Sequence, residues 1–200
     1  MLPGSLKDKF QKTVDDKTIT EWEKSGRTLP PPHIVKVKTV EHFQKKTQYS
    51  ILIESGTFMG DMIQSQLDNF DKIYSIELSE KYWESAKIMF SDQPKVNLLL
   101  GDSGEVLHSL ISEISEPAIF WLDGHYSGAD TARGEKISPI YEELKAIFKS
   151  NISHCILIDD ARLFNGTDDY PALENLKKFI VERRPEAKLE VDADTISVIY

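Results

Sequence analysis

The sequence predicts an α/β protein built on a doubly wound, mostly parallel sheet of seven strands that ends in an antiparallel hairpin. From about residue 50, short β-rich runs alternate with amphipathic helical stretches. The β-rich runs are apolar at consecutive positions, which is typical of parallel strands covered by helices on both faces. The last two runs, "AKLEVDA" and "TISVIY", are too close in sequence for a helical crossover, so they can pair only antiparallel.

The N-terminal segment differs from this pattern. Apolar side chains recur at helical spacing over residues 6–14, and Thr18 and Glu21 form a capping-box pattern that would begin a second short helix. The prolines of "LPPPH" then end any helix. We therefore expect a helical arm over residues 1–33 and a single domain over residues 34–200.

The elements of the domain follow from these runs in order. The expected strands are 49–54, 72–78, 96–102, 118–123, 154–160, 187–193 and 195–200. The expected helices are 34–47, 60–70, 79–90, 103–114, 138–149 and 171–184. Ser79 and Ser103 directly follow strands and belong to a residue type that commonly caps helix N-termini.

An acidic residue closes each of the first five strand runs. These residues are Glu54, Glu77, Asp102, Asp123 and the pair Asp159 and Asp160. Because they are spaced by about one strand–helix unit, we expect them at the carboxyl edge of the sheet, where open α/β folds bind ligands. Carboxylates repel a pyrophosphate and attract a ligand that carries positive charge and sugar hydroxyls.

The turn after the first strand, "ESGTFMGDM", supports a ligand at this edge. Gly56 and Gly60 allow the backbone to turn tightly and to approach a bound molecule. The turn lacks the third glycine of the G-x-G-x-x-G fingerprint of dinucleotide-binding folds.

Taken together, these residues resemble the class I S-adenosylmethionine-dependent methyltransferases, whose fold is Rossmann-like. The likeness covers about residues 48–200 and rests on "IESGTFMGD", "YSIELS", "LLLGDS", "FWLDGHYSG" and "ILIDDARLF" in that order. It is greatest to small bacterial enzymes that methylate hydroxyls of sugars or natural products. The sequence departs from the family's E/D-x-G-x-G-x-G by placing Thr57, Phe58 and Met59 before Gly60.

The resemblance implies a role for a set of residues at the sheet edge. S-adenosylmethionine would be bound by Glu54, Gly56, Thr57, Gly60, Glu77, Leu78, Asp102, Ser103 and Asp123. In the family pattern Glu77 would accept hydrogen bonds from the ribose hydroxyls and Asp102 from the adenine amino group. Asp123 would lie between the charged end of the cofactor and the methyl acceptor.

A hydroxyl acceptor must be aligned with the methyl group and must lose a proton. We expect Asp123 and His125 as catalytic residues, with His125 as a base that titrates near neutral pH. In a second arrangement Asp123, Asp159 and Asp160 hold Mg²⁺, which would orient the acceptor and lower its pKa. The polar loop after Asp123, with glycines at 124, 128 and 134, would close over the acceptor.

The expected function is therefore methyl transfer from S-adenosylmethionine to a small polar acceptor, a hydroxyl of a sugar or secondary metabolite. One alternative is an NAD(P)-dependent oxidoreductase, because Glu77 stands near the position of the ribose-binding acid of dinucleotide folds. Another is a non-catalytic nucleotide-binding module on the same fold.

Composition narrows the class of partner. The formal net charge is −9 and no block of Lys or Arg occurs, so we expect no nucleic-acid partner. No apolar run approaches the roughly 20 residues of a membrane helix, and the N-terminus lacks the apolar core of a secretory signal. The single cysteine, Cys155, indicates a reducing compartment, and we expect a cytoplasmic protein. A homo-oligomer is compatible with the sequence.

Overall fold

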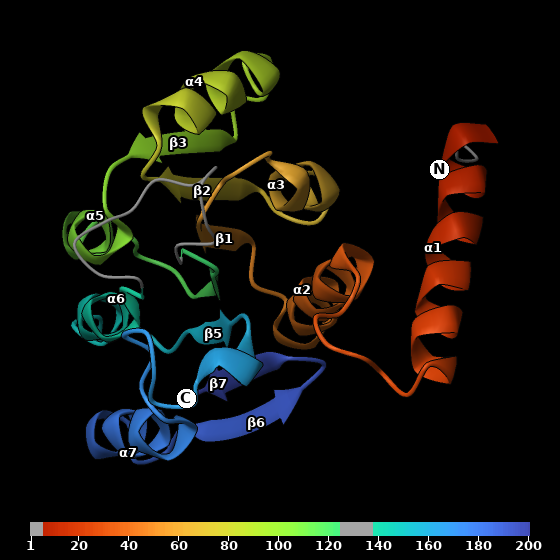
Figure 1. Ribbon diagram of the computed structural model, residues 1–200. Coiled ribbons are helices and arrows are strands. Elements are labelled where there is room, and N and C mark those ends of the chain that lie inside the picture. The colour runs from red at the N-terminus through yellow and green to blue at the C-terminus, as the bar shows by residue number, and fades with distance from the viewer. Residues whose placement is uncertain (1–5, 125–137) are drawn as a thin grey trace.

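The computed structural model describes residues 6–124 and 138–200, which form a seven-stranded sheet with helices on both faces (Figure 1). The strands are β1 Ile51–Ser55, β2 Lys72–Glu77, β3 Val96–Leu100, β4 Ala118–Leu122, β5 Cys155–Ile158, β6 Lys188–Asp192 and β7 Thr195–Ile199. The helices are α1 Leu6–Lys24, α2 His33–Thr47, α3 Asp61–Gln66, α4 Glu80–Met89, α5 Ser103–Leu110, α6 Ile140–Ile147, the 3₁₀ turn η1 Ala161–Leu163, and α7 Leu173–Arg183.

The strand order is β3-β2-β1-β4-β5-β7-β6, and the first five strands are parallel to one another. Strand β7 is inserted antiparallel between β5 and β6. Ala193 and Asp194 join β6 to β7 with positive φ angles of 46° and 66°, as a two-residue hairpin turn requires. The predicted fold class, including the terminal hairpin, is confirmed.

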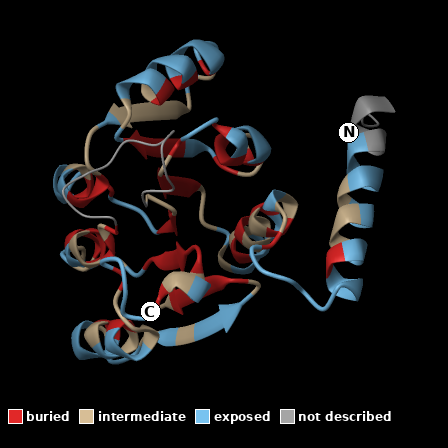
Figure 2. Cartoon of the chain, viewed as in Figure 1, coloured by how far each residue is buried: buried red, intermediate tan, exposed pale blue. Residues whose placement is uncertain are grey.

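Side chains of the central strands alternate between two hydrophobic cores, one on each face of the sheet. In β4, Phe120 and Leu122 pack with residues of α5, α6 and α7. Ile119 and Trp121 point the other way and pack with residues of α2, α3 and α4. Because both faces are covered, the central strands are buried along their whole length, as Figure 2 shows. This explains the continuous apolar runs in the sequence.

Helix α1 stands away from the sheet and makes its contacts with α2 (Figure 1). The prediction that a second helix begins at Thr18 is wrong, because α1 runs without interruption from Leu6 to Lys24. Inside a helix the Thr18 hydroxyl bonds the carbonyl of Val14, at 3.0 Å, and needs no capping role. Within the described residues, no helix combines the length and the apolar character of a membrane span.

The prediction that Ser103 caps α5 is also wrong. The N-cap is Asp102, whose carboxylate accepts a hydrogen bond from the Gly104 backbone N–H at 2.8 Å. An aspartate satisfies an unpaired N–H at a helix N-terminus and also interacts favourably with the helix dipole. Ser79 does occupy the N-cap position of α4, although its side chain makes no capping hydrogen bond.

Candidate active site

The strand-end acids lie at one edge of the sheet, as the sequence predicted. Glu77 is the last residue of β2, and its register partner is Leu100 at the end of β3. The backbone N–H of Asp123 donates to Ser55 at the end of β1 at 3.1 Å. The backbone N–H of Asp159 in turn donates to the carbonyl of Leu122, at 3.0 Å. The carboxyl ends of β1, β4 and β5 therefore meet side by side.

The turn after β1 approaches the end of β4 so closely that it needs glycine. Gly56 has a φ of +86°, and a Cβ built on it would lie 2.5 Å from the carbonyl oxygen of Asp123. Gly60 precedes α3 with a φ of +78°, and a Cβ there would lie 2.8 Å from the ring of Phe90. Both glycines are thus required by sterics as well as by conformation.

The Glu77 carboxylate organises the loop between β1 and α3. One oxygen accepts from the Phe58 backbone N–H and the other from the Ser79 backbone N–H, each at 2.8 Å. Glu77 is buried, while the neighbouring Leu78 is exposed beside it. Phe58 is held at a positive φ of 47°, with its ring 4.9 Å from that of Tyr82. Glu77 therefore fixes the backbone on which a ligand at this edge would lie.

Glu54 lies beneath this loop. Its carboxylate accepts a hydrogen bond from the Ser75 hydroxyl at 2.5 Å, and Ser75 is also 2.6 Å from the Thr57 hydroxyl. All three side chains are buried. Burial raises the pKa of Glu54 to about 8, opposed by the Ser75 hydrogen bond. The structure thus gives Glu54 and Thr57 a place in a buried network, and sequence reasoning missed Ser75, which links them.

At the end of β3, Asp102 and Ser103 are engaged with neighbouring elements. Asp102 caps α5, and the Ser103 hydroxyl donates to the carboxylate of Glu143 in α6 at 2.7 Å. Glu143 is buried, and nothing in the spacing of the sequence predicts that it reaches Ser103. A Cβ on Gly124 would lie 3.2 Å from the Ser103 hydroxyl, so the ends of β3 and β4 are also close.

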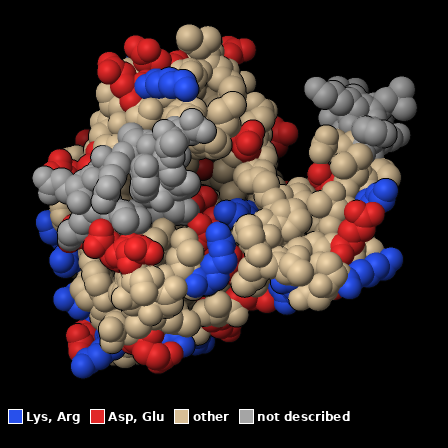
Figure 3. All heavy atoms as spheres, in the orientation of Figure 1, with Lys and Arg blue, Asp and Glu red and all other residues tan. Residues whose placement is uncertain are grey.

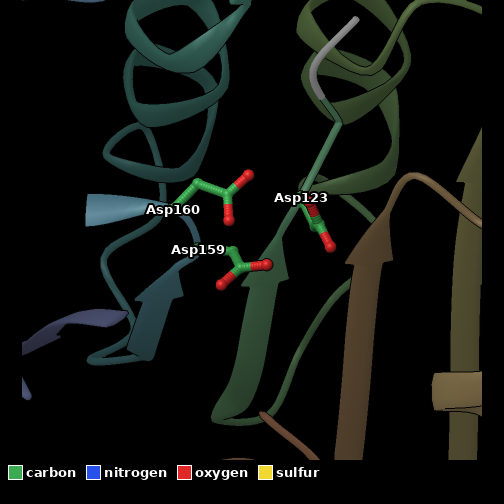
Figure 4. A group of neighbouring side chains, drawn as sticks. All are labelled: Asp123, Asp159 and Asp160. Carbon is green, nitrogen blue, oxygen red and sulfur yellow. The ribbon is translucent and has the colours of Figure 1, made fainter. Parts of the chain in front are cut away.

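Three carboxylates gather between the ends of β4 and β5. One oxygen each from Asp123, Asp159 and Asp160 lies within 4.8 Å of the others (Figure 4). Asp160 adopts a positive φ of 56°, which turns the chain after β5. Asp159 is buried, and among the described residues its Oδ1 has no hydrogen-bond partner. Burial and the nearby Asp123 carboxylate raise the pKa of Asp159.

A lysine that sequence reasoning missed lies within this cluster. Lys36, in the first turn of α2, donates a hydrogen bond to Oδ2 of Asp159. Its ammonium is also 3.9 Å from Asp123 and 3.7 Å from Asp160. Burial by itself lowers the pKa of Lys36, but the three carboxylates together raise it above its ordinary value. In the sequence, Lys36 could have been singled out because it stands between two valines, Val35 and Val37, on a predicted helix.

The cluster meets the chemical requirement of a Mg²⁺ site but already contains a cation. Three carboxylate oxygens are suitable ligands for a hard divalent ion. The Lys36 ammonium lies within 4 Å of all three carboxylates, in the region that such an ion would share with them. Unit charges of like sign 4 Å apart repel by about 4 kcal/mol at an effective dielectric of 20, and a divalent ion doubles this. Mg²⁺ therefore fits only when Lys36 withdraws.

Asp160 is held from its other side by the C-terminal hairpin. The Arg162 guanidinium is 2.6 Å from Asp160 and also forms an ion pair with Asp194, which lies in the β6–β7 turn. Asp194 additionally accepts the Arg162 backbone N–H at 2.8 Å. The antiparallel end of the sheet thus helps to position the cluster.

A small pocket adjoins the cluster. It is lined by Leu122, Gly124, Ser138, Pro139, Ile140, Glu143, Ile158, Asp159, Phe164 and Tyr170. It has room for about one water molecule, and its lining combines apolar side chains with the buried carboxyl groups of Glu143 and Asp159. His125 and most of the polar loop after Asp123 lie outside the described residues, so the predicted base and the predicted closure are not described.

No protein-family model and no curated protein sequence matches this chain. Its structure, by contrast, is similar to solved methyltransferases. The SAH-bound methyltransferase PaMTH1 of Podospora anserina has a TM-score of 0.60 at 16% identity, covering 100% of this chain and 97% of that one. The O-methyltransferase TomG of Streptomyces achromogenes, involved in tomaymycin synthesis and solved with SAM, has a TM-score of 0.60 at 15% identity, covering 92% and 87%. The 23S rRNA methyltransferase ErmE has a TM-score of 0.50 at 14% identity, covering 81% and 66%.

The chain therefore has the fold of class I S-adenosylmethionine-dependent methyltransferases. Identities this low establish a shared architecture and do not transfer an acceptor, since one fold hosts many reactions. TomG and ErmE illustrate this variety of reactions, because one takes part in tomaymycin synthesis and the other is a 23S rRNA methyltransferase.

Proposed function

We propose that this chain is an S-adenosylmethionine-dependent methyltransferase that methylates a hydroxyl group of a small polar molecule. One observation carries the proposal: Glu77 is buried at the carboxyl edge of β2 with both oxygens fixed by the N–H groups of Phe58 and Ser79. A carboxylate has further lone pairs on each oxygen, so it can still accept from a pair of vicinal hydroxyls. The similarity to PaMTH1 and TomG, solved with SAH and SAM, supports the choice of cofactor.

In this proposal the sheet edge binds S-adenosylmethionine along the ends of β1 to β4. Glu77 accepts the ribose hydroxyls beside the apolar side chain of Leu78, while Asp102 and Ser103 border the adenine. Gly56, Thr57 and Gly60 form the turn along the methionine end, and Glu54 supports that turn through Ser75. The negative charge of this edge favours the sulfonium and ammonium groups of the cofactor.

Bound S-adenosylmethionine supplies a methyl group that is already activated by its sulfonium. The protein aligns the acceptor oxygen with that carbon; the O–C bond forms as the C–S bond breaks, and the hydroxyl proton passes to a base. Among the described residues Asp123 is the candidate for that base, because it lies at the end of β4 next to the Gly56 turn. His125 is the second candidate, from its position two residues later in the sequence.

A small acceptor fits the charge of the chain better than RNA does. The net charge is −9, and Figure 3 shows acidic and basic side chains interspersed over the part of this face that is coloured by residue type. Binding to a nucleic-acid backbone depends on clustered Lys and Arg.

Mg²⁺ at Asp123, Asp159 and Asp160 is a second form of the proposal. It requires that Lys36 leave the cluster on metal binding, because the ammonium competes for the same carboxylates.

The test is ligand binding followed by transfer. Isothermal titration and thermal denaturation with S-adenosylmethionine, S-adenosylhomocysteine and NAD separate the methyltransferase from an oxidoreductase. A ligand of the native state at about 100 times its dissociation constant adds about 2.7 kcal/mol to the free energy of unfolding. We expect both adenosyl compounds to stabilise the protein and NAD to have no effect. Stabilisation by NAD alone would overturn the proposal.

Transfer is then measured with a methyl-labelled cofactor and a panel of sugars, phenols and small RNAs. We expect label on a hydroxyl of a small compound. Label on RNA would overturn the small-acceptor part of the proposal, and binding without transfer to any member of a broad panel would favour a non-catalytic module.

A further inference from the structure

We propose that Lys36 is the resident cation of the Asp123–Asp159–Asp160 cluster and takes the place of a divalent metal, so that the site works without one. The part of this inference that concerns catalysis rests on the proposed methyltransferase function. The part that concerns metal binding does not, because it follows from the charges and distances of the cluster alone.

The position of the ammonium is the first argument. Nζ of Lys36 donates to Asp159 and lies 3.9 Å from Asp123 and 3.7 Å from Asp160. An ion bound by all three carboxylates would have to lie about 2.0–2.6 Å from an oxygen of each, between the same three groups. The two cations therefore compete for one location.

The packing of α2 is the second argument, since it holds Lys36 in place. Helix α2 contacts both β4 and β5, and Val37 and Val40 are buried in the core on that face of the sheet. The Lys36 side chain is only 17% exposed, so its aliphatic part is enclosed while its charged end reaches the carboxylates. Withdrawal of the ammonium toward solvent would leave the buried Asp159 without its counter-ion.

The balance of charge is the third argument. Among the described residues, Lys36 from α2 and Arg162 from η1 form ion pairs with the cluster, and Arg162 is shared with Asp194 of the β6–β7 turn. Both cations are thus already paired with these carboxylates, and a divalent ion that entered beside Lys36 would be repelled by its ammonium. Without Lys36, the three carboxylates and the buried Oδ1 of Asp159 would form an oxygen-rich site for a hard cation.

The test compares Mn²⁺ binding by the native protein, Lys36→Met and Lys38→Met. Lys38 lies on the same helix but pairs with Glu41 and is half exposed, which makes it a matched control. Binding is followed by isothermal titration and by the loss of the free Mn²⁺ signal in electron paramagnetic resonance. Neither readout needs cofactor or acceptor, so failure of this inference can be distinguished from failure of the proposed function.

We expect native protein and Lys38→Met to leave the Mn²⁺ signal unchanged, and Lys36→Met to bind one ion at least about tenfold more tightly. Asp159→Asn in the Lys36→Met background should abolish that binding. Lys36→Arg keeps the charge, so it should bind no metal, and it provides a folded variant if Lys36→Met is unstable. We also expect methyl transfer by native protein to persist after treatment with EDTA.

Stoichiometric Mn²⁺ binding by the native protein would overturn the inference. So would a folded Lys36→Met that binds no more Mn²⁺ than native, or a transfer activity that EDTA abolishes and Mg²⁺ restores.

Discussion

Lys36 in helix α2 donates a hydrogen bond to Asp159, which follows strand β5 and lies 123 residues later in the chain. This contact joins the N-terminal part of the domain to the ends of β4 and β5 in the candidate site. It forms because α2 packs across β4 and β5 and points the first turn of the helix at the carboxyl edge of the sheet. The site is thus assembled from helix α2 as well as from the loops that follow the strands.

Glu77→Gln is expected to weaken the binding of S-adenosylhomocysteine about 10- to 100-fold. Hydrogen bonds to a charged group are worth about 1.5–3 kcal/mol, and the amide would also place N–H donors against the loop backbone. Glu80→Gln, on the exposed surface three residues later, is the control and should bind as the native protein does. Titration calorimetry measures the affinity of both variants for S-adenosylhomocysteine. If the two affinities were equal, Glu77 would not belong to the proposed cofactor site.

Gly56→Ala is expected to destabilise the protein by about 2–4 kcal/mol and to abolish cofactor binding. Alanine at a positive φ costs about 1–2 kcal/mol, and the new Cβ would also overlap the Asp123 carbonyl oxygen. Gly26→Ala is a matched control, because Gly26 has nearly the same φ, +85°, with no atom within 4 Å of the added Cβ. Urea denaturation should show a smaller loss for Gly26→Ala, and a loss as large as that of Gly56→Ala would argue that the close approach to Asp123 is unimportant.

Glu54 should make the protein less stable as the pH rises. Its folded pKa of about 8 lies above its ordinary value of 4.5. Its contribution to the free energy of unfolding is therefore fully present below pH 4.5 and is lost as the pH rises through about 8. The loss is at most about 1.4 kcal/mol per pH unit.

Glu54→Gln should remove this contribution, whereas the exposed Glu105→Gln should retain it. The measurement is chemical denaturation of native protein and both variants at pH 5, 7 and 8.5. An unchanged pH dependence in Glu54→Gln would show that the buried carboxyl does not titrate in this range.

Asp194→Asn should lower stability by about 1–3 kcal/mol and slow methyl transfer. Asparagine tolerates the positive φ of the turn, so the substitution removes the charge that anchors Arg162 and, through it, Asp160. Asp192→Asn breaks an exposed ion pair with Arg27 and should change stability by less than about 1 kcal/mol. Thermal and urea denaturation compare the two variants. Equally small losses of stability would show that the hairpin does not position the cluster.

Removal of residues 1–28 should leave a folded domain that still binds S-adenosylhomocysteine. Helix α1 contacts α2 rather than the sheet, and the proposed cofactor residues all lie at or beyond β1. Circular dichroism and calorimetry test this expectation. Loss of folding in the truncated chain would mean that the arm, through Trp22, which is buried, belongs to the domain.

The sequence was sufficient for the fold and for one edge of the site. The parallel strands, the terminal hairpin, the acids at the strand ends and the glycines of the first turn were all predicted, because each depends on local patterns. Apolar runs specify buried strands, chain length between strands specifies the crossover, and a strand that is placed carries its last residue to the sheet edge. Even so, Thr18 and Ser103 were misassigned, since a hydroxyl can bond within a helix as well as cap one.

The partners of those acids were decided by the tertiary structure alone. Lys36 reaches Asp159, Ser103 reaches Glu143 and Arg162 reaches Asp194 across elements whose relative placement no local pattern encodes. In the sequence Lys36 is simply a charged residue on an amphipathic helix. It becomes part of a charged cluster only because packing of the neighbouring valines on the sheet holds that turn of α2 above the ends of β4 and β5.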